Sequence, residues 1–336
     1  MKRNYDDKLK GMLIGLAVGD MLGMPVEFKD PDDFEPITEP IAGGSFNLPA
    51  GYWTDDTSMA LCLADSLLEY GGYNSYDVMN KYWLWRSAGY RSSTGKCFDI
   101  GNQTSEAINQ YMMTGGFVRA DKQRTTNAGN GAIMRLAPVI IAAHRQRSPK
   151  DIIKMAKISA RETHYSLEAE LATEVFATLL LRAIKTKVKS KVLKKPKLGT
   201  WRRFVMFDDE VEINGKPAPQ FSYRTVYEDV MRATEFSQSD INTSGYIIHS
   251  LQVAVWGFTK YDNFKDGALA VANLGGDADT NAAIYGQLAG AFYGYKGIPH
   301  KWRKTLYRER EISQLADKLI AMPTCPILLT RFEEDY

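Results

Sequence analysis

Apolar residues recur with the period of an α-helix along almost the whole chain, and this pattern constrains the fold class. Near the N-terminus, Leu9, Met12, Leu13, Leu16 and Ala17 follow the spacing i, i+3, i+4, i+7, i+8, which places them on one helix face. Strand-like segments are few, and no alternation of strands with helices indicates a parallel sheet. The sequence therefore predicts an all-α fold.

The same pattern predicts most of the other elements. It returns at Met59, Leu63, Leu67 and Leu68, directly after a Thr-Asp-Asp-Thr-Ser segment. The strand-like segments lie on either side of an acidic turn, and they are Thr200–Met206 and Val211–Ile213. Further helices are expected at 75–87, 103–113, 130–146, 149–160, 166–185, 223–237, 244–259, 264–273, 279–293, 299–306 and 311–321.

Charge is nearly balanced over the whole chain but not along it. The net charge of +2 gives no general reason to expect a nucleic-acid or membrane-surface partner. Residues 185–204 nonetheless hold nine Lys or Arg and no Asp or Glu, so the rest of the chain carries a net charge of −7. We interpret residues 186–222 as an insertion between two helices. It is either a solvated loop or a contact surface for a partner protein or nucleic acid.

The cysteines and the longest uncharged stretch bear on the compartment. Cys62, Cys97 and Cys325 form no CxxC pair, and their odd number argues against a disulfide scaffold or a common zinc ribbon. The acidic residues near the N-terminus argue against a signal peptide. The uncharged stretch 241–259 is too polar to span a bilayer. The sequence therefore predicts a cytoplasmic protein without a membrane partner.

Two segments place paired carboxylates and a threonine hydroxyl at predicted helix N-termini. Asp and Thr are ordinary helix caps, but one cap needs one side chain and each segment offers three. Asp277 and Asp279 would point apart on a regular helix, and Gly275-Gly276 permits the non-helical turn in which they converge. The oxygen-bearing residues are Thr54, Asp55 and Asp56 in the first segment and Asp277, Asp279 and Thr280 in the second.

If these two segments face each other, four carboxylates share a small volume and repel one another unless cations intervene. Carboxylates and hydroxyls are suitable ligands for Mg²⁺ or Mn²⁺, and four anionic ligands suit two divalent ions. A pair of such ions lowers the pKa of a water molecule and makes it a nucleophile. The hypothesis requires that the two segments meet.

A third segment, residues 125–135, places two Asn and two Gly residues before an apolar helix. Backbone N–H groups at such a turn can bind an anion such as a diphosphate, although a plain turn with a helix cap explains the same residues. The segment matches neither GxxxxGK[ST] nor GxGxxG. The small residues that follow the second acidic segment, among them Ala282, Gly286 and Gly290, indicate close helix packing.

Several segments, taken in order, resemble the ADP-ribosylglycohydrolase family, which includes dinitrogenase-reductase-activating glycohydrolases and ADP-ribosylarginine hydrolases. The combination of WTDDT with GGDADTNAAIYGQ is specific. The matching segments are GMLIGLAVGDMLGMPVEF (11–28), WTDDTSMAL (53–61), DIGNQT (99–104), NAGNGAIMRLAP (127–138), Thr163-His164, SGYIIHSLQVAVW (244–256) and NLGGDADTNAAIYGQLAGAFYG (273–294).

The resemblance implies a compact, orthogonal multi-helix domain over residues 1–336, with two Mg²⁺ or Mn²⁺ ions in a cleft. Residues 186–222 depart from the family pattern as a small irregular or β-hairpin insertion. The loop Ser92–Gly95 is expected over the cleft. The implied metal ligands are Thr54, Asp55, Asp56, Asp277, Asp279 and Thr280, with Glu27 nearby; Asp56, Asp279 or Glu27 would act as the base; and Asn127, Gly129, Asn130, Gly131, His164 and Tyr246 would bind the substrate.

The implied reaction is hydrolysis of the bond between ADP-ribose and an arginine guanidinium, through an oxocarbenium-like state. The partner would be an ADP-ribosylated protein. Three alternatives stay open: an O-linked substrate such as a serine adduct or small metabolite, an immunity protein that binds an ADP-ribosyltransferase through 186–222, and an inactive relative. All six ligand positions hold oxygen donors, which argues against the last.

Overall fold

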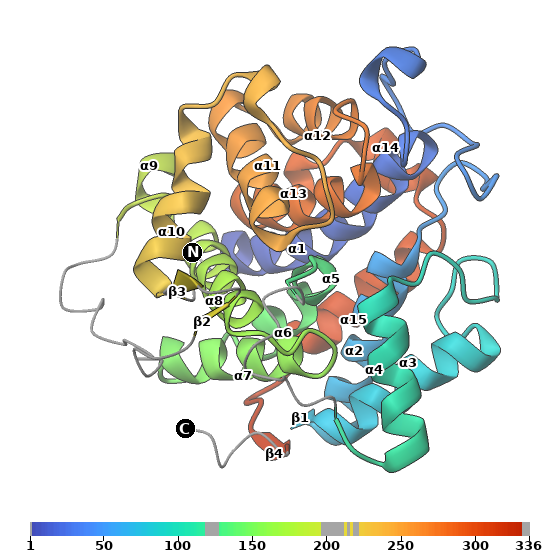
Figure 1. Cartoon of the computed structure of the whole chain (residues 1–336), viewed down its shortest axis with the longest axis vertical. Coiled ribbons are helices and arrows are strands. Elements are labelled where there is room, and N and C mark those ends of the chain that lie inside the picture. Colours follow the sequence, from blue (N-terminus) through green and yellow to red (C-terminus); the bar gives the residue numbers. More distant parts are fainter. Residues whose placement is uncertain (1, 118–127, 196–211, 214–215, 218–221, 331–336) are drawn as a thin grey trace.

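The computed structural model describes residues 2–117, 128–195, 212–213, 216–217 and 222–330, and in these residues the fold is built from α-helices as predicted (Figure 1). The helices are α1 Lys2–Gly23, α2 Asp55–Tyr70, α3 Ser75–Ala88, α4 Asn102–Thr114, α5 Gly131–Met134, α6 Ala137–Ala142, α7 Pro149–Arg161, α8 Leu167–Ala183, α9 Lys189–Val192, α10 Tyr223–Met231, α11 Ile247–Lys260, α12 Phe264–Ala272, α13 Ala278–Tyr293, α14 His300–Thr305 and α15 Glu309–Ala321; the strands are β1 Tyr73–Asn74, β2 Glu212–Ile213, β3 Lys216–Pro217 and β4 Ile327–Leu329.

Helices α1 and α13 lie side by side at the centre of the fold, and glycines bring their backbones into contact (Figure 1). A Cβ atom at any of the facing α1 glycines would come closer than 3.0 Å to the α13 backbone, which real Cβ atoms essentially never do. The antiparallel pairs are Gly11 with Gly290, Gly15 with Gly286, Gly19 with Ala282 and Gly23 with Ala278. The close packing predicted for the small residues of α13 is therefore present, and the end of α1 lies against the start of α13.

The segment Asn4–Val26, which includes most of α1, is long and apolar enough by length and composition to cross a membrane. In the structure 94% of its most apolar stretch is buried inside the fold. Its apolar composition is therefore accounted for by its place as a central helix packed on all sides.

The helix predicted at 130–146 is wrong as a continuous element. The chain forms two short helices instead, α5 and α6, separated at Arg135 and Leu136. Pro138 lies in the first turn of α6, where its missing N–H is tolerated; inside a continuous helix its ring would clash with the preceding turn. The helix predicted at 244–259 also begins later, at Ile247.

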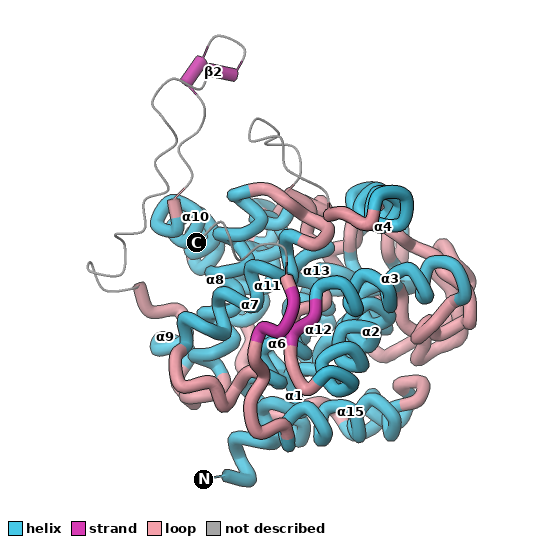
Figure 2. The backbone as a smooth tube through the Cα atoms, turned by 90° about the horizontal axis from the view of Figure 1, so that it is seen from below, coloured by secondary structure: helices cyan, strands magenta, loops and turns pink. Residues whose placement is uncertain are grey.

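Short strands account for the β-structure in the described residues. Strands β1 and β4 form a parallel ladder that the sequence did not predict (Figures 1 and 2). Strands β2 and β3 pair as an antiparallel hairpin within the insertion, where strand character was expected around Val211–Ile213. The predicted strand Thr200–Met206 lies outside the described residues.

The first part of the insertion is structured. Val192, in the short helix α9, is buried, and the Arg182 guanidinium of α8 donates to the Val192 carbonyl oxygen at 3.1 Å. Lys189 donates to the Tyr261 carbonyl oxygen and pairs with Asp262 at 2.9 Å. Residues 189–192 therefore pack on the helical body rather than forming a solvated loop. The organisation of residues 1–336 as one domain stays a prediction.

Candidate metal centre and its pocket

The two acidic segments meet at the N-termini of α2 and α13. The Thr54 hydroxyl lies 2.9 Å from Oδ2 of Asp279, and the Thr280 hydroxyl lies 3.2 Å from Oδ2 of Asp56. Both contacts join residues more than 220 positions apart in the sequence. The juxtaposition on which the metal hypothesis depended is therefore present in the structure.

The glycine turn before α13 has the backbone that the sequence indicated. Gly275 and Gly276 have φ values of 66° and 63°, in the left-handed region that favours glycine. A Cβ at Gly276 would also come closer than 3.0 Å to the Thr243 side chain. This turn places Asp277 just before the helix and Asp279 in its first turn, so the two carboxylates converge despite their i, i+2 spacing.

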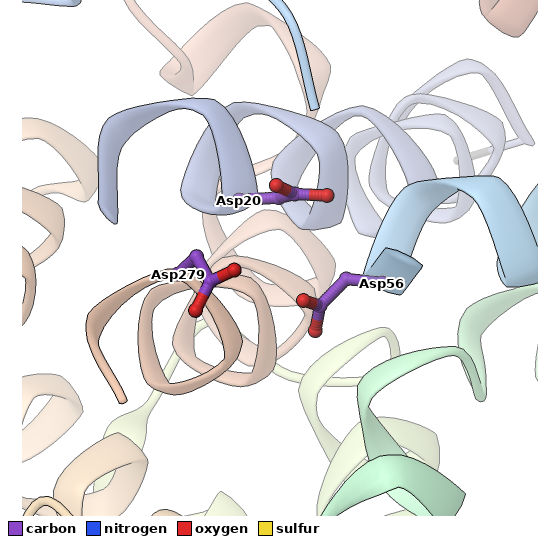
Figure 3. Close-up of side chains that lie close together, drawn as sticks. All are labelled: Asp20, Asp56 and Asp279. Carbon is purple, nitrogen blue, oxygen red and sulfur yellow. The ribbon is translucent and has the colours of Figure 1, made fainter. Parts of the chain in front are cut away.

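Six other carboxylates surround Asp279. Together they form three groups of three residues whose oxygen atoms lie within 4.8 Å of one another, and Asp279 belongs to every one of these groups. Figure 3 shows one such group, with carboxylates gathered from α1, α2 and α13. The groups are Asp20, Asp56 and Asp279; Glu27, Asp277 and Asp279; and Asp55, Asp99 and Asp279. The structure thus brings the predicted acidic residues together around one side chain.

Two members of these groups, Asp20 and Asp99, were missed in the sequence. Asp20 is fully buried on α1 and accepts hydrogen bonds from the backbone N–H groups of Thr54 and Thr57 at 2.9 and 3.0 Å. It is the only charged residue between positions 11 and 26, and a lone carboxylate in an apolar helix was the available signal. Asp99 has a φ of 60° and lies in the DIGNQT segment, which drew attention only as a family motif.

The cluster is electrostatically unfavourable without a counter-charge. Burial raises the pKa of Asp20 to about 6, and burial together with the neighbouring charge of Asp20 raises that of Asp279 to about 6. Burial and the Asp279 charge raise the pKa of Asp277 to about 7, of Asp99 to about 10 and of Glu27 to about 12. Protons or cations are therefore needed to neutralise this site at neutral pH.

Hydrogen bonding leaves oxygen atoms available for such a cation. The single proton of the Thr54 hydroxyl faces carboxylate oxygens of Asp20, Asp56 and Asp279, all within 3.2 Å, and it can be donated to only one of them. Within the described part of the chain, buried Oε2 of Glu27 and Oδ1 of Asp56 have no hydrogen-bond partner. An all-oxygen donor set of this kind fits a hard divalent cation.

The raised pKa values predict how stability depends on pH. Because the folded protein binds protons more tightly than the unfolded chain, the stabilisation is complete below about pH 4 and is lost as the pH rises through 6 to 7. We expect the gain in melting temperature on adding Mn²⁺ or Mg²⁺ to be larger at pH 8 than at pH 5.5. Scanning calorimetry at both pH values, with chelator and with metal, measures it. If the gain in melting temperature is the same at both pH values, the acidic cluster is not where the added cation binds.

A pocket of about 760 Å³ opens over the acidic cluster. Of the predicted site residues, the pocket is lined by Glu27, Asp55, Gly129, Asn130, Gly131, His164, Asp277 and Thr280. Asp56 and Asp279 are buried beneath it and have exposed fractions of 0% and 1%. Asn127 lies outside the described residues. The metal-binding and substrate-binding candidates thus share one cavity.

The Asn-Gly turn is used differently from the predicted anion cradle. The Gly129 N–H donates to Oε1 of Gln103 at 3.2 Å, and the Asn130 N–H donates to the Gly245 carbonyl oxygen at 3.0 Å. These two backbone donors are therefore already engaged by the protein. The Asn130 side chain donates to Oδ2 of Asp277 at 2.6 Å, which ties the turn to the acidic cluster.

His164 packs against this turn and is neutral. A Cβ at Gly131 would come closer than 3.0 Å to the imidazole ring, so glycine is needed there. Burial, followed by the charge of Arg135, lowers the pKa of His164 to about 3. Arg135 is fully buried and donates to the Gly131 carbonyl oxygen at 2.7 Å and the Thr163 hydroxyl at 2.6 Å, and that hydroxyl lies 2.8 Å from Nδ1 of His164. Arg135 therefore holds both the Gly131 backbone and, through Thr163, the His164 ring in place at the edge of the pocket.

The predictions for Tyr246 and for the loop Ser92–Gly95 stay predictions. The Tyr246 side chain is not among the residues that line the pocket; its hydroxyl donates to Glu168, while its backbone pairs with Gly129. The loop Ser92–Gly95 does not line the pocket either, and the Ser93 hydroxyl donates to the Trp53 carbonyl oxygen at 2.6 Å. Hydrogen bonds to residues distant in sequence determine both positions.

The chain is similar in sequence and in fold to known proteins. The sequence profile of the ADP-ribosylglycohydrolase family matches residues 1–326. The chain is 36% identical over 316 residues to the ADP-ribosylarginine hydrolase Tri1 of Serratia proteamaculans, covering 94% of this chain and 80% of that protein. It is 29% identical to the ADP-ribosyl-[dinitrogen reductase] glycohydrolase of Rhodospirillum rubrum, covering 94% and 96%. A solved structure described as an ADP-ribosylglycohydrolase-related protein complex has a TM-score of 0.75 and 36% identity, covering 96% of this chain and 100% of that one.

Proposed function

Because the chain belongs to the ADP-ribosylglycohydrolase family, we propose that it hydrolyses the N-glycosidic bond between ADP-ribose and an arginine side chain of a modified protein. The observation that carries this proposal is the cluster of buried carboxylates beneath a pocket of about 760 Å³. The similarity to an ADP-ribosylarginine hydrolase supports the choice of linkage.

The donor set suits two divalent cations, Mg²⁺ or Mn²⁺. When bound, these ions would supply a water molecule of lowered pKa and would orient the ribose hydroxyls. The chain would hold them through Thr54, Asp55, Asp56, Asp277, Asp279 and Thr280. Asp20 would orient these ligands rather than bind the ions itself. Its carboxylate accepts hydrogen bonds from the backbone N–H groups of Thr54 and Thr57 at the N-terminus of α2, and so fixes the position of Thr54.

The side chains above the cluster would position and deprotonate the reactants. Of the three carboxylates considered as the base, only Glu27 lines the pocket, and its Oε2 atom has no hydrogen-bond partner among the described residues. With the cations bound, their charge would lower the pKa of Glu27 again, and Glu27 would accept a proton from the attacking water at Oε2 as the C–N bond breaks. Neutral His164 would bind a ribose hydroxyl, and arginine would leave as the free side chain.

We expect a chelator to abolish hydrolysis and Mn²⁺ or Mg²⁺ to restore it, because the carboxylates cannot remain ionised together without a cation. Release of ADP-ribose from an arginine-modified protein, with a serine-modified peptide as the parallel substrate, measures both the metal requirement and the linkage. Release from the serine peptide alone would replace the arginine assignment by an O-linked one. Activity unaffected by exhaustive chelation would contradict the metal mechanism.

Binding of an ADP-ribosyltransferase stays an alternative role for the insertion. Deleting residues 196–221 and repeating both hydrolysis and capture of a transferase would separate the two activities. A cytoplasmic location is also part of the proposal, and the three free cysteines support it.

A further inference from the structure

Phe28 is an aromatic residue at the pocket wall whose side chain is largely exposed. Its exposed fraction is 65%, and it lines the same pocket as Glu27 and Asp277. Its φ angle is 63°, in the left-handed region that a bulky side chain adopts only at a cost in stability. Among the described residues no aromatic ring stacks on it. Phe28 therefore combines an unfavourable backbone with little packing in return.

The backbone around Phe28 is held by the turn that carries the acidic cluster. The Phe28 N–H donates to the Gly276 carbonyl oxygen at 2.7 Å, and the Gly276 N–H donates to the Lys29 carbonyl oxygen at 2.9 Å. These reciprocal bonds fix Phe28 beside Asp277 and keep the strained conformation. A strained residue that the surrounding structure fixes at a site is typical of a functional position.

We propose that Phe28 is a specificity-determining residue that stacks on the guanidinium of the arginine-linked substrate. The inference rests on the proposed function, because it names the group on the leaving side of the scissile bond. Phe28 directly follows Glu27, whose carboxylate lies within 4.8 Å of Asp277 and Asp279, so its ring is anchored one residue from the cluster. The adenine lies at the other end of ADP-ribose, away from the bond that breaks.

The charge around the ring favours a cation. The charged residues that line the pocket are five carboxylates and one lysine, Lys29, and the histidine in the lining, His164, is neutral. The carboxylates are Glu27, Asp30, Asp55, Asp99 and Asp277. Four of these carboxylates belong to the cluster that protons or cations neutralise, whereas Asp30 is exposed and lies outside it. A planar cation beside Phe28 therefore gains from the charge of Asp30 and from the face of an aromatic ring. A serine linkage offers neither a positive charge nor a planar group.

The test compares four Phe28 variants on an arginine-modified protein. Phe28→Ala and Phe28→Leu are expected to lower kcat/KM about tenfold, because both remove the ring face. Phe28→Tyr keeps the ring and is expected to recover most of the loss. The affinity for free ADP-ribose, measured by calorimetry, should change less than twofold in Phe28→Ala. Tyr70→Ala removes an exposed aromatic that does not line the pocket, and it serves as the control.

The variant Phe28→Gly distinguishes a role of the ring in substrate binding from a role in the stability of the fold. Glycine relieves the left-handed strain, so the melting temperature should rise while kcat/KM for the arginine substrate falls. A lower melting temperature would show that the ring stabilises the fold and would overturn the proposal. So would an unchanged kcat/KM in Phe28→Ala, or an equal loss of ADP-ribose affinity, which would place the ring on ADP-ribose. If the wild-type protein does not cleave the arginine linkage, the proposed function itself fails, whatever the variants show.

Discussion

Asp279→Asn is expected to lower the rate of hydrolysis by about a thousandfold while the fold is retained. Asp279 is the one residue shared by all three carboxylate groups, so its replacement weakens every way in which the cluster can bind a cation. The amide oxygen of Asn can still accept from the Thr280 N–H, which lies 2.8 Å from Oδ1 of Asp279 in the wild-type protein, and its NH2 group can donate to the Thr54 hydroxyl, which lies 2.9 Å from Oδ2. The local hydrogen bonds are therefore kept while the charge is lost.

Stability gives a second readout for the same variant. Without metal, Asp279→Asn removes one of the repelling charges, and we expect it to melt higher than the wild-type protein at pH 8. Added Mn²⁺ should raise its melting temperature less than that of the wild type. The control is Asp317→Asn, which removes a 59% exposed carboxylate from a surface ion pair with Lys10 and should change neither quantity appreciably. Wild-type turnover in Asp279→Asn would exclude the acidic cluster from the mechanism.

Local patterns in the sequence were enough to predict the two halves of the acidic centre. Asp55 and Asp56 precede an apolar helix, and Asp277 and Asp279 follow a glycine pair, so each half is visible in a short window. Asp20 was missed because a helical pattern treats it as an interruption of the apolar face rather than as a ligand for another element. Asp20 accepts a hydrogen bond from the Thr54 N–H at the start of α2, and a local sequence pattern cannot show that α2 begins next to this part of α1.

The wall of the pocket depended still more on tertiary structure. The NAGNG segment suggested free backbone donors, but Gln103 and Gly245 accept from two of them in the fold. Arg135 stood out in the sequence only as part of a motif, and its bond to Thr163 joins residues 28 positions apart, which no local pattern predicts. Propensity and spacing therefore located this segment but did not determine what its polar groups bind.

Gly19→Ala is expected to destabilise the protein by about 2–3 kcal/mol and to lower activity about a hundredfold, although it adds one methyl group at a residue that does not line the pocket. The new Cβ would come closer than 3.0 Å to the backbone carbonyl of Ala282, so the two central helices must separate. Alanine is the better helix former by about 1 kcal/mol, which offsets only part of this cost. Asp20 follows Gly19 directly and Asp279 begins the facing helix, so the separation moves two carboxylates of one group apart.

Urea unfolding and the hydrolysis assay measure these two effects. The stability control is Gly101→Ala, which adds the same methyl group where no atom lies within 4 Å and where φ is −64°. We expect this control to lose at most about 1 kcal/mol, because nothing has to move and only the preference for glycine over alanine at the N-cap of α4 is lost. Gly101 lines the pocket, so this variant is a control for stability and not for turnover. If Gly19→Ala matched it in stability and kept wild-type turnover, then close contact of α1 with α13 would not be what aligns the acidic centre. If Gly19→Ala loses turnover and clearly more stability than Gly101→Ala, then the geometry of the acidic centre depends on the glycines of the buried helix α1.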